Sequence, residues 1–529
     1  MTLIVPGAPT RRGLLLGAGA ATGVLAAPGL LRAAPSSIDP FTLGVASGDP
    51  LPDGFVLWTR LAPDPLAKDG LGGMSSAVTV DWEVARDPAM RQTAAKGRAV
   101  ADAGFVHSVH VEVGGLQPDR PYWYRFTAMG AQSPVGRART APRPGARMDR
   151  LKVVACSCAH YELGWFSAYR HMAAEEPDLA FFLGDYIYEY SYRGDRGREN
   201  VRLHERDEDV VDLAGFRVRY AQYKTDPDLQ ALHAVAPSVV TWDDHEVQND
   251  YSGAWSQDVS ISQTQMLARR AAGYRAFYEH MPLRRHHRPN GPDMRIYRRM
   301  GFGDLADITV LDGRQYRSIQ ACASPTSRRG HVAKDAECAN RTDPTRTMLG
   351  AAQEDWLYKG FKRGGARWTV IAQDLLVAPA LEHAPGGGFG YFTDSWDGYA
   401  ANRDRMLAAL AGSKARNPVF FGGDVHCFFN TDLKADFADP AARTIATEFV
   451  TTAVTQNPPA GSPYAGVMAR SPHIKFFDET TRGYIGFEIG RDRMETRFQA
   501  ISDRADPKAT VRTLQRFVVE DGKPGAVAV

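Results

Sequence analysis

The chain has 529 residues, of which 44% are hydrophobic and 23% are charged. This composition supports a large buried core and excludes a disordered polypeptide, and the length predicts two or three domains. The formal net charge is +2, and residues 1–34 contain three arginines and no acidic residue, so the remaining chain is close to neutral. A near-neutral body argues against a nucleic-acid-binding surface.

Residues 1–34 are typical of an export signal. Arg11 and Arg12 precede a short apolar run, LLLGAGAATGVLAA. This run is too short and too rich in glycine and alanine for a stable membrane span. The Thr-Arg-Arg start favours twin-arginine export, with an ordinary secretory signal as the alternative. We therefore expect a periplasmic or secreted protein that the twin-arginine machinery exports in a folded state.

Residues 39–140 are predicted to form a β-sandwich domain. Segments such as VASGDPLPDGFVLWTRL are rich in β-forming residues and are bounded by glycine, proline and aspartate turns. GLQPDRPYWYRF resembles the tyrosine-corner strand of immunoglobulin-like and fibronectin-like sandwiches, with Leu116 and Tyr122 as the packing pair. The arginine- and proline-containing segment 137–151 is predicted to link this domain to the next.

From residue 150 the pattern changes to strands that alternate with helices. Strand-like LKVVACS precedes helix-like GWFSAYRHMAAEE, and similar pairs continue to residue 505. This alternation predicts an α/β domain over residues 150–505. IYRRMGFG and DLADITVLD are predicted to form an antiparallel hairpin on its sheet, and residues 506–529 are interpreted as a C-terminal tail.

The chain contains five cysteines, so at least one thiol stays unpaired in an exported protein. Cys322 and Cys338 flank a polar loop, and we predict a disulfide between them. Cys156 and Cys427 are interpreted as core residues. Cys158 stands at the end of a predicted strand, where a buried structural cysteine is the alternative to a functional one.

Four predicted strands end on side chains that commonly bind metals. Open α/β sheets bind ligands at the carboxyl ends of their strands, so we expect these side chains to meet. The set combines carboxylate and phenol oxygens with a thiol and imidazoles, which predicts two unlike metal sites. The residues are Cys158, Asp185, Tyr188, Asp244, His245, Asp424 and His426.

The donor types suggest how the two sites divide. The first is suited to Fe(3+), because phenolate and thiolate stabilise the oxidised ion, and it would be formed by Cys158, Asp185, Tyr188 and His426. The second is suited to Ca(2+) or another hard divalent ion, and it would be formed by Asp185, Asp244 and Asp424. Asp185 would bridge the two cations, which lower the pKa of bound water.

Several segments resemble, in order, the alkaline phosphatase D family. They include VASGDPLPDGFVLWTRL, ACSCAHYELGWFSAYRHMAAEEPDLAFFLGDYIYEY, TWDDHEVQNDYSG, VLDGRQYR, DSWDGYAANRDRML and GGDVHCFF. The resemblance extends from about residue 40 to about residue 500. It implies an exported phosphatase and phosphodiesterase with an iron–calcium centre. It also implies a four-layer α/β/β/α metallophosphoesterase sandwich, similar to that of purple acid phosphatases, after an immunoglobulin/fibronectin-like β-sandwich.

The sequence departs from the wider metallophosphoesterase pattern at three ligand positions. Cys158 stands where that pattern has an aspartate, and Asp244 replaces its asparagine. GDVH, which carries Asp424 and His426, replaces its GHxH step. These changes make the second site more anionic, which agrees with calcium better than with zinc. Gln373 is a weak candidate for a further histidine of that pattern.

Two further residues are assigned to the substrate. The resemblance implies that His245 contacts the phosphate or the leaving group, and it is a candidate general acid; the alternative is that it orients Asp244. Arg314 is a candidate for neutralising the phosphate, with a structural ion pair as the alternative. Asn249 and Asp250 follow on a loop that is expected to line the site.

The predicted function is hydrolysis of phosphate mono- and/or diesters by a metal-bound oxide or hydroxide. The first alternative is a phosphodiesterase or phospholipase D-like specificity on the same centre. The second is a non-catalytic exported binding protein that keeps the fold. The sequence contains neither GxxxxGK[ST] nor GxSxG, so no covalent phosphoenzyme is expected.

Overall fold

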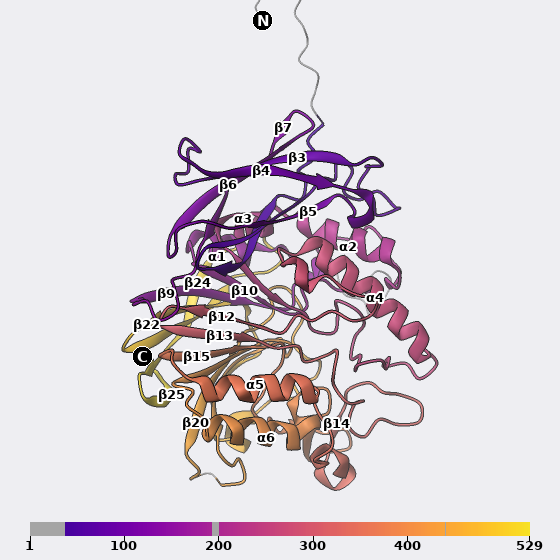
Figure 1. The fold of residues 1–529 in the computed structure, drawn as a ribbon. Helices are drawn as coiled ribbons and strands as arrows, with labels where there is room; N and C mark the ends of the chain where they lie inside the picture. The colour runs from indigo at the N-terminus through magenta and orange to yellow at the C-terminus, as the bar shows by residue number, and fades with distance from the viewer. Residues whose placement is uncertain (1–37, 193–199, 440) are drawn as a thin grey trace, which may run out of the picture. The chain divides into compact units, whose positions relative to one another are not determined.

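The computed structural model describes residues 38–192, 200–439 and 441–529 (Figure 1). The predicted export signal at residues 1–34 lies outside these residues. Residues 38–529 form one compact unit, and most of its strands belong to two large sheets.

The larger sheet has ten strands and a parallel centre, in which β10 pairs with a parallel strand on each side. β10 has the sequence LAFFL and is buried throughout, as expected for a strand covered on both faces. In order across the sheet, the strands are β25 (Lys523–Ala528), β24 (Val511–Glu520), β23 (Arg493–Ile501), β22 (Arg482–Gly490), β9 (Arg150–Cys156), β10 (Leu179–Leu183), β11 (Ser238–Thr241), β1 (Val45–Leu51), β2 (Gly54–Arg60) and β5 (Ser108–Val113).

The second sheet has seven strands, and it also has a parallel centre. Its first two strands form the predicted antiparallel hairpin, which is confirmed. In order, the strands are β12 (Arg298–Phe302), β13 (Ala306–Val310), β15 (Trp368–Ala372), β18 (Pro418–Gly422), β20 (Thr444–Val450), β19 (Phe428–Lys434) and β21 (Ile474–Asp478).

Three of the α-helices in the described residues begin at residues whose side chains cap them. Asp212 and Asp226 accept hydrogen bonds from backbone N–H groups in the first turns of α2 and α3, and Ser262 forms a capping box with Gln265 at the start of α4. The helices are α1 (Ser167–Ala174), α2 (Leu213–Lys224), α3 (Pro227–Val235), α4 (Gln263–His280), α5 (Ala351–Arg363), α6 (Ala400–Ala411) and α7 (Val467–Arg470).

The two large sheets pack face to face. Phe181 of β10 belongs to one buried cluster with Ile308, Val370 and Phe421 of the seven-stranded sheet. Successive side chains of a strand point to opposite faces, so Phe182 lies on the other side of the ten-stranded sheet. The facing sheets place their strand ends along a common edge.

Helices cover the outer faces of both sheets. Phe182 packs in a cluster with Phe277 of α4. On the seven-stranded sheet, Ile371 packs with Leu357 of α5 and Leu407 of α6. Figure 1 shows α5 and α6 side by side along this sheet. From one outer face to the other, the layers are therefore helices, the ten-stranded sheet, the seven-stranded sheet and helices.

The N-terminal β-domain has a further, five-stranded sheet that packs on β1, β2 and β5. Leu116 and Tyr122 are buried in this cluster, and the Tyr122 hydroxyl accepts a 3.0 Å hydrogen bond from the N–H of Gln117. The predicted packing pair is confirmed. The strands are β4 (Thr93–Ala101), β3 (Val78–Ala85), β6 (Pro121–Ala128), β7 (Ala131–Gln132) and β8 (Gly136–Arg139).

The N-terminal strands are continuous with the ten-stranded sheet. β1 pairs in parallel with β11 through Gly48 and Ser238. A Cβ atom at Gly48 would lie 2.4 Å from the carbonyl oxygen of Pro282, so the close approach of β1 to Pro282 requires glycine. The predicted division near residues 140–150 is therefore a change in sequence pattern, and it does not separate the sheets.

The prediction of a C-terminal tail at residues 506–529 is wrong. β24 and β25 form the edge of the ten-stranded sheet, and β24 pairs with β23 from Val511 to Glu520. Phe517 and Val519 are buried between the sheets. The other residues of β24 are mostly polar, so its alternating pattern is weak in the sequence.

The predicted disulfide between Cys322 and Cys338 is confirmed. It closes a loop beside a three-stranded sheet, whose strands are β14 (Val332–Ala333), β17 (Phe389–Phe392) and β16 (Glu382–His383). Among the helices of the described residues, none is long and apolar enough to cross a membrane.

Candidate metal centre

The predicted ligand residues follow the carboxyl ends of four strands. Cys158, Asp185 and Asp424 each lie two residues after β9, β10 and β18, and Asp244 lies three residues after β11. β9, β10 and β11 are neighbouring parallel strands of the ten-stranded sheet, whereas β18 belongs to the facing sheet. The site therefore lies where strand ends of both sheets meet.

Four residues at these ends have a backbone conformation that non-glycine residues rarely adopt. The φ angle is +59° at Cys158, +52° at Asp185, +65° at Asp424 and +55° at His426. Such conformations cost free energy and persist where the surrounding structure holds them, often at functional sites. Their concentration at one edge supports a functional role for these turns.

Gly184 allows two of the turns to approach closely. Its φ angle is +93°, and a Cβ atom at this position would lie 2.5 Å from the Cβ of Asp243. Any larger residue would push the turn after β10 away from the turn after β11. The glycine thus brings Asp185 close to the aspartates that follow β11.

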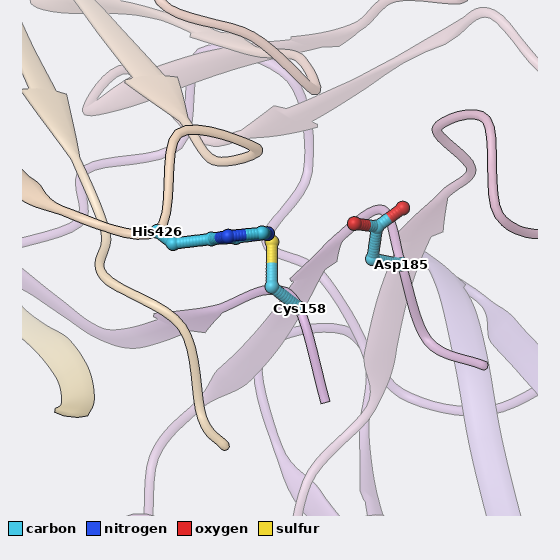
Figure 2. Close-up of side chains that lie close together, drawn as sticks. All are labelled: Cys158, Asp185 and His426. Atoms are coloured by element: carbon cyan, nitrogen blue, oxygen red, sulfur yellow. The ribbon is translucent and has the colours of Figure 1, made fainter. Parts of the chain in front are cut away.

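The four residues predicted to bind iron lie together. Ligand atoms of Cys158, Asp185 and His426 lie within 4.8 Å of one another, and Figure 2 shows the sulfur beside the imidazole. The Tyr188 hydroxyl donates a 2.8 Å hydrogen bond to Oδ2 of Asp185 and lies 3.3 Å from Nε2 of His426. All four side chains are buried or nearly so.

The acidic residues group differently from the prediction. Ligand atoms of Asp185 and Asp424 lie within 4.8 Å of one another and of a carboxylate oxygen of Asp243, which the sequence analysis did not select. Asp244 instead forms a similar group with Asp185 and His245. Both aspartates occur in the TWDDH segment, and the motif alone does not reveal which side chain faces Asp424.

A further acidic group extends from Asp244. Its carboxylate lies within 4.8 Å of ligand atoms of Asp250 and Asp394. Asp250 was expected to line the site, whereas Asp394 was missed, although it begins the DSWDGY segment. Asp394 also accepts hydrogen bonds from Arg317 at 2.9 Å and Gln320 at 2.6 Å, so its charge is partly compensated by the protein.

Three carboxylate oxygens of the candidate ligands are buried without a hydrogen-bond donor. They are Oδ1 of Asp185, Oδ2 of Asp243 and Oδ1 of Asp244. A buried carboxylate oxygen without a partner is costly unless a cation binds it. Their positions fit hard cations, which prefer oxygen ligands.

The local electrostatics also fit bound cations. Burial raises the pKa of Asp185 well above its usual range, and Asp244 and Asp243 add to the increase. Burial also raises the pKa of Asp424, and Asp243 contributes. Burial lowers the pKa of His426 to about 3, so its imidazole is neutral and able to bind a metal.

Arg314 is at the centre of the acidic residues. Its side chain is 0% exposed and donates hydrogen bonds to Asp243 and, at 2.6 Å, to Asp394. Its Nη2 lies 3.6 Å from Oδ2 of Asp244. These contacts support the alternative considered from the sequence, a structural ion pair, whereas the assignment of Arg314 to the phosphate stays a prediction.

His245 lies against the metal-binding residues. Its ring is 4.2 Å from the ring of Tyr188, and its Nε2 is 3.9 Å from Oδ1 of Asp244. Its Nδ1 contacts Glu189, which the sequence analysis did not select. Although burial alone would lower it, Asp244 and Glu189 raise the pKa of His245 well above its usual value.

Glu246 is another residue that the sequence analysis missed. Its carboxylate accepts hydrogen bonds from the backbone N–H groups of Asp185 at 3.2 Å, Tyr186 at 2.6 Å and Asp243 at 2.9 Å. One side chain thus ties the turn after β10 to the turn after β11. Its position directly after DDH is the only signal in the sequence.

Three weaker assignments are resolved by local contacts. The Gln373 oxygen accepts hydrogen bonds from the N–H of Leu375 at 2.9 Å and the indole of Trp396 at 3.2 Å. These contacts indicate a structural role for Gln373. Cys156 and Cys427 are buried in separate hydrophobic clusters, as predicted.

Comparisons with known proteins agree with this fold and site. A family model described as PhoD-like phosphatase matches residues 153–498, and one described as PhoD-like phosphatase, N-terminal domain, matches residues 26–142. The chain is 41% identical over 502 residues to alkaline phosphatase D of Bacillus subtilis (strain 168), which spans 94% of this chain and 83% of that protein. It also matches a solved structure of PhoD with a TM-score of 0.86 and 40% identity, over 93% of this chain and 92% of that one.

The fold, the site and these relatives define a phosphoric ester hydrolase. The chain belongs to the PhoD-like phosphatase family. The resemblance found in the sequence motifs is thereby confirmed, and it supports an enzyme over a non-catalytic binding protein.

Proposed function

We propose that this phosphoesterase is an exported, metal-dependent enzyme that hydrolyses phosphate mono- and diesters at a centre of Fe(3+) and Ca(2+). The observation that carries the proposal is the meeting of Cys158, Tyr188 and His426 around Asp185, beside further buried aspartates. A thiol, a phenol and a neutral imidazole suit Fe(3+), and carboxylates suit Ca(2+). The layer order and the tyrosine corner support the metallophosphoesterase sandwich and the immunoglobulin/fibronectin-like domain that the sequence suggested.

Asp185 lies in both ligand groups and would bridge the cations. Iron would be held by Cys158, Tyr188 and His426, while Asp243, Asp244 and Asp424 would hold calcium. When bound, the cations supply an ionised water as nucleophile and compensate the charge of the phosphate.

The chain's own residues would orient the reaction. Arg314 fixes Asp243, Asp244 and Asp394 by ion pairs, so these carboxylates keep their positions when the substrate enters. His245 lies near the carboxylates of Asp244 and Asp185 and would donate a proton from Nε2 to the leaving-group oxygen. The phosphate would therefore bind between the cations and His245.

Metal analysis and turnover of two esters test the proposal. We expect purified full-length protein to contain iron and calcium and to hydrolyse both nitrophenyl phosphate and bis-nitrophenyl phosphate. Cys158→Ala should lose iron and activity together, whereas Cys156→Ala, two residues earlier in the core, should keep both. Turnover of the diester alone would favour the phosphodiesterase or phospholipase D-like alternative, and activity without either metal would refute the proposed centre.

Export is supported by the arginine pair in the sequence. Replacing Arg11 and Arg12 by lysine should retain the protein in the cytoplasm, measured by fractionation and immunoblotting. Normal export of this variant would instead indicate an ordinary secretory signal.

A further inference from the structure

Glu189 and His245 form a buried side-chain pair beside the metal-binding residues. Oε2 of Glu189 lies 2.7 Å from Nδ1 of His245, and both side chains are buried. The two residues come from different strand ends, since Glu189 follows β10 and His245 follows β11. A carboxylate has no proton to share when ionised, so Nδ1 carries the hydrogen of this contact.

The second oxygen of Glu189 is also fixed. Oε1 accepts a 2.8 Å hydrogen bond from the N–H of Asn249 and lies 3.9 Å from Nη2 of Arg269. Arg269 is itself held by a 2.7 Å hydrogen bond from Nε to the carbonyl of Val247. Since both oxygens have partners, the carboxylate cannot rotate away from His245 without losing a buried hydrogen bond.

The contact at Nδ1 determines what the other ring nitrogen faces. Nε2 lies 3.9 Å from Oδ1 of Asp244, and His245 groups with Asp244 and Asp185. One face of the ring is covered by Tyr188, with ring centres 4.2 Å apart. A flip of the ring would separate Nδ1 from Glu189, so Nε2 is directed into the site.

We propose that Glu189 is a positioning residue that holds the His245 ring so that Nε2–H points at the leaving-group oxygen of the phosphate ester. This inference rests on the proposed function. The attacking water oxygen forms a bond to phosphorus, and the bond from phosphorus to the leaving oxygen breaks. The leaving oxygen keeps the electron pair and takes the proton of Nε2, and the proton released by the attacking water restores His245. An analogous carboxylate–imidazole contact orients the histidine in hydrolytic triads.

A purely structural role for Glu189 makes a different prediction. If the carboxylate only fixed the loop at Asn249, its loss would affect all esters alike. If it orients a proton donor, the loss depends on the leaving group, because a basic alkoxide or phenolate needs the proton more than a weakly basic one. Comparing nitrophenyl phosphate with phenyl phosphate separates the two roles.

The test uses Glu189→Gln in the full-length, metal-loaded enzyme. We expect kcat for phenyl phosphate to fall by about 10²-fold or more, and kcat for nitrophenyl phosphate to fall by less than about 10-fold, with KM and metal content nearly unchanged. Glu189→Asp should restore part of the phenyl phosphate activity. In a His245→Ala background, Glu189→Gln should cause no further loss, because the two residues act as one unit.

Glu448→Gln is the matched control. Glu448 is also buried and accepts hydrogen bonds from two backbone N–H groups, at Val377 and Ala378, but it makes no hydrogen bond to His245. Its substitution should affect both esters equally.

Equal losses on both esters for Glu189→Gln, or additive losses with His245→Ala, would overturn the positioning role while leaving the phosphoesterase function intact. No turnover of either ester by the wild-type enzyme would overturn the proposed function and this inference with it. If Glu189→Gln folds poorly, Glu189→Asp and the His245→Ala background decide between the same outcomes.

Discussion

The Tyr188 hydroxyl donates a 2.8 Å hydrogen bond to Oδ2 of Asp185 and lies 3.3 Å from Nε2 of His426. One phenol thus contacts the carboxylate proposed to bridge the cations and an imidazole that comes from the facing sheet. Burial raises the pKa of Tyr188 well above its usual range, and Asp185 adds to the increase. The phenol is therefore neutral without a cation, and its ionisation reports directly on bound iron.

Tyr188→Phe should remove the phenolate ligand while preserving the packing of the ring. We expect loss of the visible absorption that an iron-bound phenolate produces and a decrease in iron content, measured by spectroscopy and elemental analysis. Activity should fall with the iron, because phenolate favours the oxidised ion.

Tyr190→Phe is the control for this substitution. The Tyr190 ring packs edge-on against Tyr188, with centres 5.7 Å apart, but its hydroxyl contacts Tyr192 and Gln456. This variant should keep both colour and iron. Retention of the absorption by Tyr188→Phe would show that another residue supplies the phenolate.

The sequence was sufficient for features that depend on local pattern. The apolar run LAFFL predicts a buried strand. A metal-binding side chain just after such a strand predicts a metal site at that end of the sheet. Which of two adjacent aspartates faces the cluster depends on how the chain leaves β11, and Gly184, in the turn after β10, allows the close approach of the two turns. Contacts between separate strand ends, such as that of Glu189 with His245, also leave no signal in a motif.

Edge strands of the fold are also difficult to predict from a local sequence pattern. β24 buries Phe517 and Val519 but exposes mostly polar side chains, and its partner β23 supplies the missing evidence. Pairing between strands is a tertiary property, so a weakly alternating segment is recognised only when its neighbour is known.

Asp243→Asn tests the ligand that the sequence analysis missed. Its carboxylate groups with Asp185 and Asp424, so an amide should weaken calcium binding and lower kcat by about 10-fold to 100-fold, as expected for a change at a metal site. Calcium titration with a turnover readout measures both effects. Asp432→Asn, which changes a buried aspartate that pairs with Lys475 instead, should bind calcium normally. Normal calcium affinity in Asp243→Asn would indicate that Asp244, and not Asp243, binds calcium with Asp185 and Asp424.

Arg314→Met tests the structural ion pair. It leaves Asp243 and Asp244 without their buried cation and Asp394 with Arg317 alone, and we expect the metal-free protein to lose about 3–5 kcal/mol of unfolding free energy in urea. Calcium should restore part of the loss because it compensates the same charges. If Arg314 instead contacted the phosphate, the variant would keep its stability and show a higher KM.

The pH dependence of stability should change when the metals are removed. The folded pKa values of Asp185 and Asp424 are raised, so between the unfolded value of about 4 and the folded values the native state binds more protons than the unfolded state. These two groups therefore lower the free energy of unfolding of the metal-free protein as pH rises above about 4, since unfolding then releases their protons, whereas His426, with its pKa lowered to about 3, acts in the opposite direction up to its unfolded value of about 6.5. His245 acts in the same direction at higher pH, because its raised pKa stabilises the folded state only while the imidazole is protonated. The melting temperature of chelator-treated protein should fall relative to that of metal-loaded protein between about pH 7 and pH 9, because groups that do not face the cations titrate alike in both forms. Equal slopes with and without metal would mean that the cations do not bind these carboxylates.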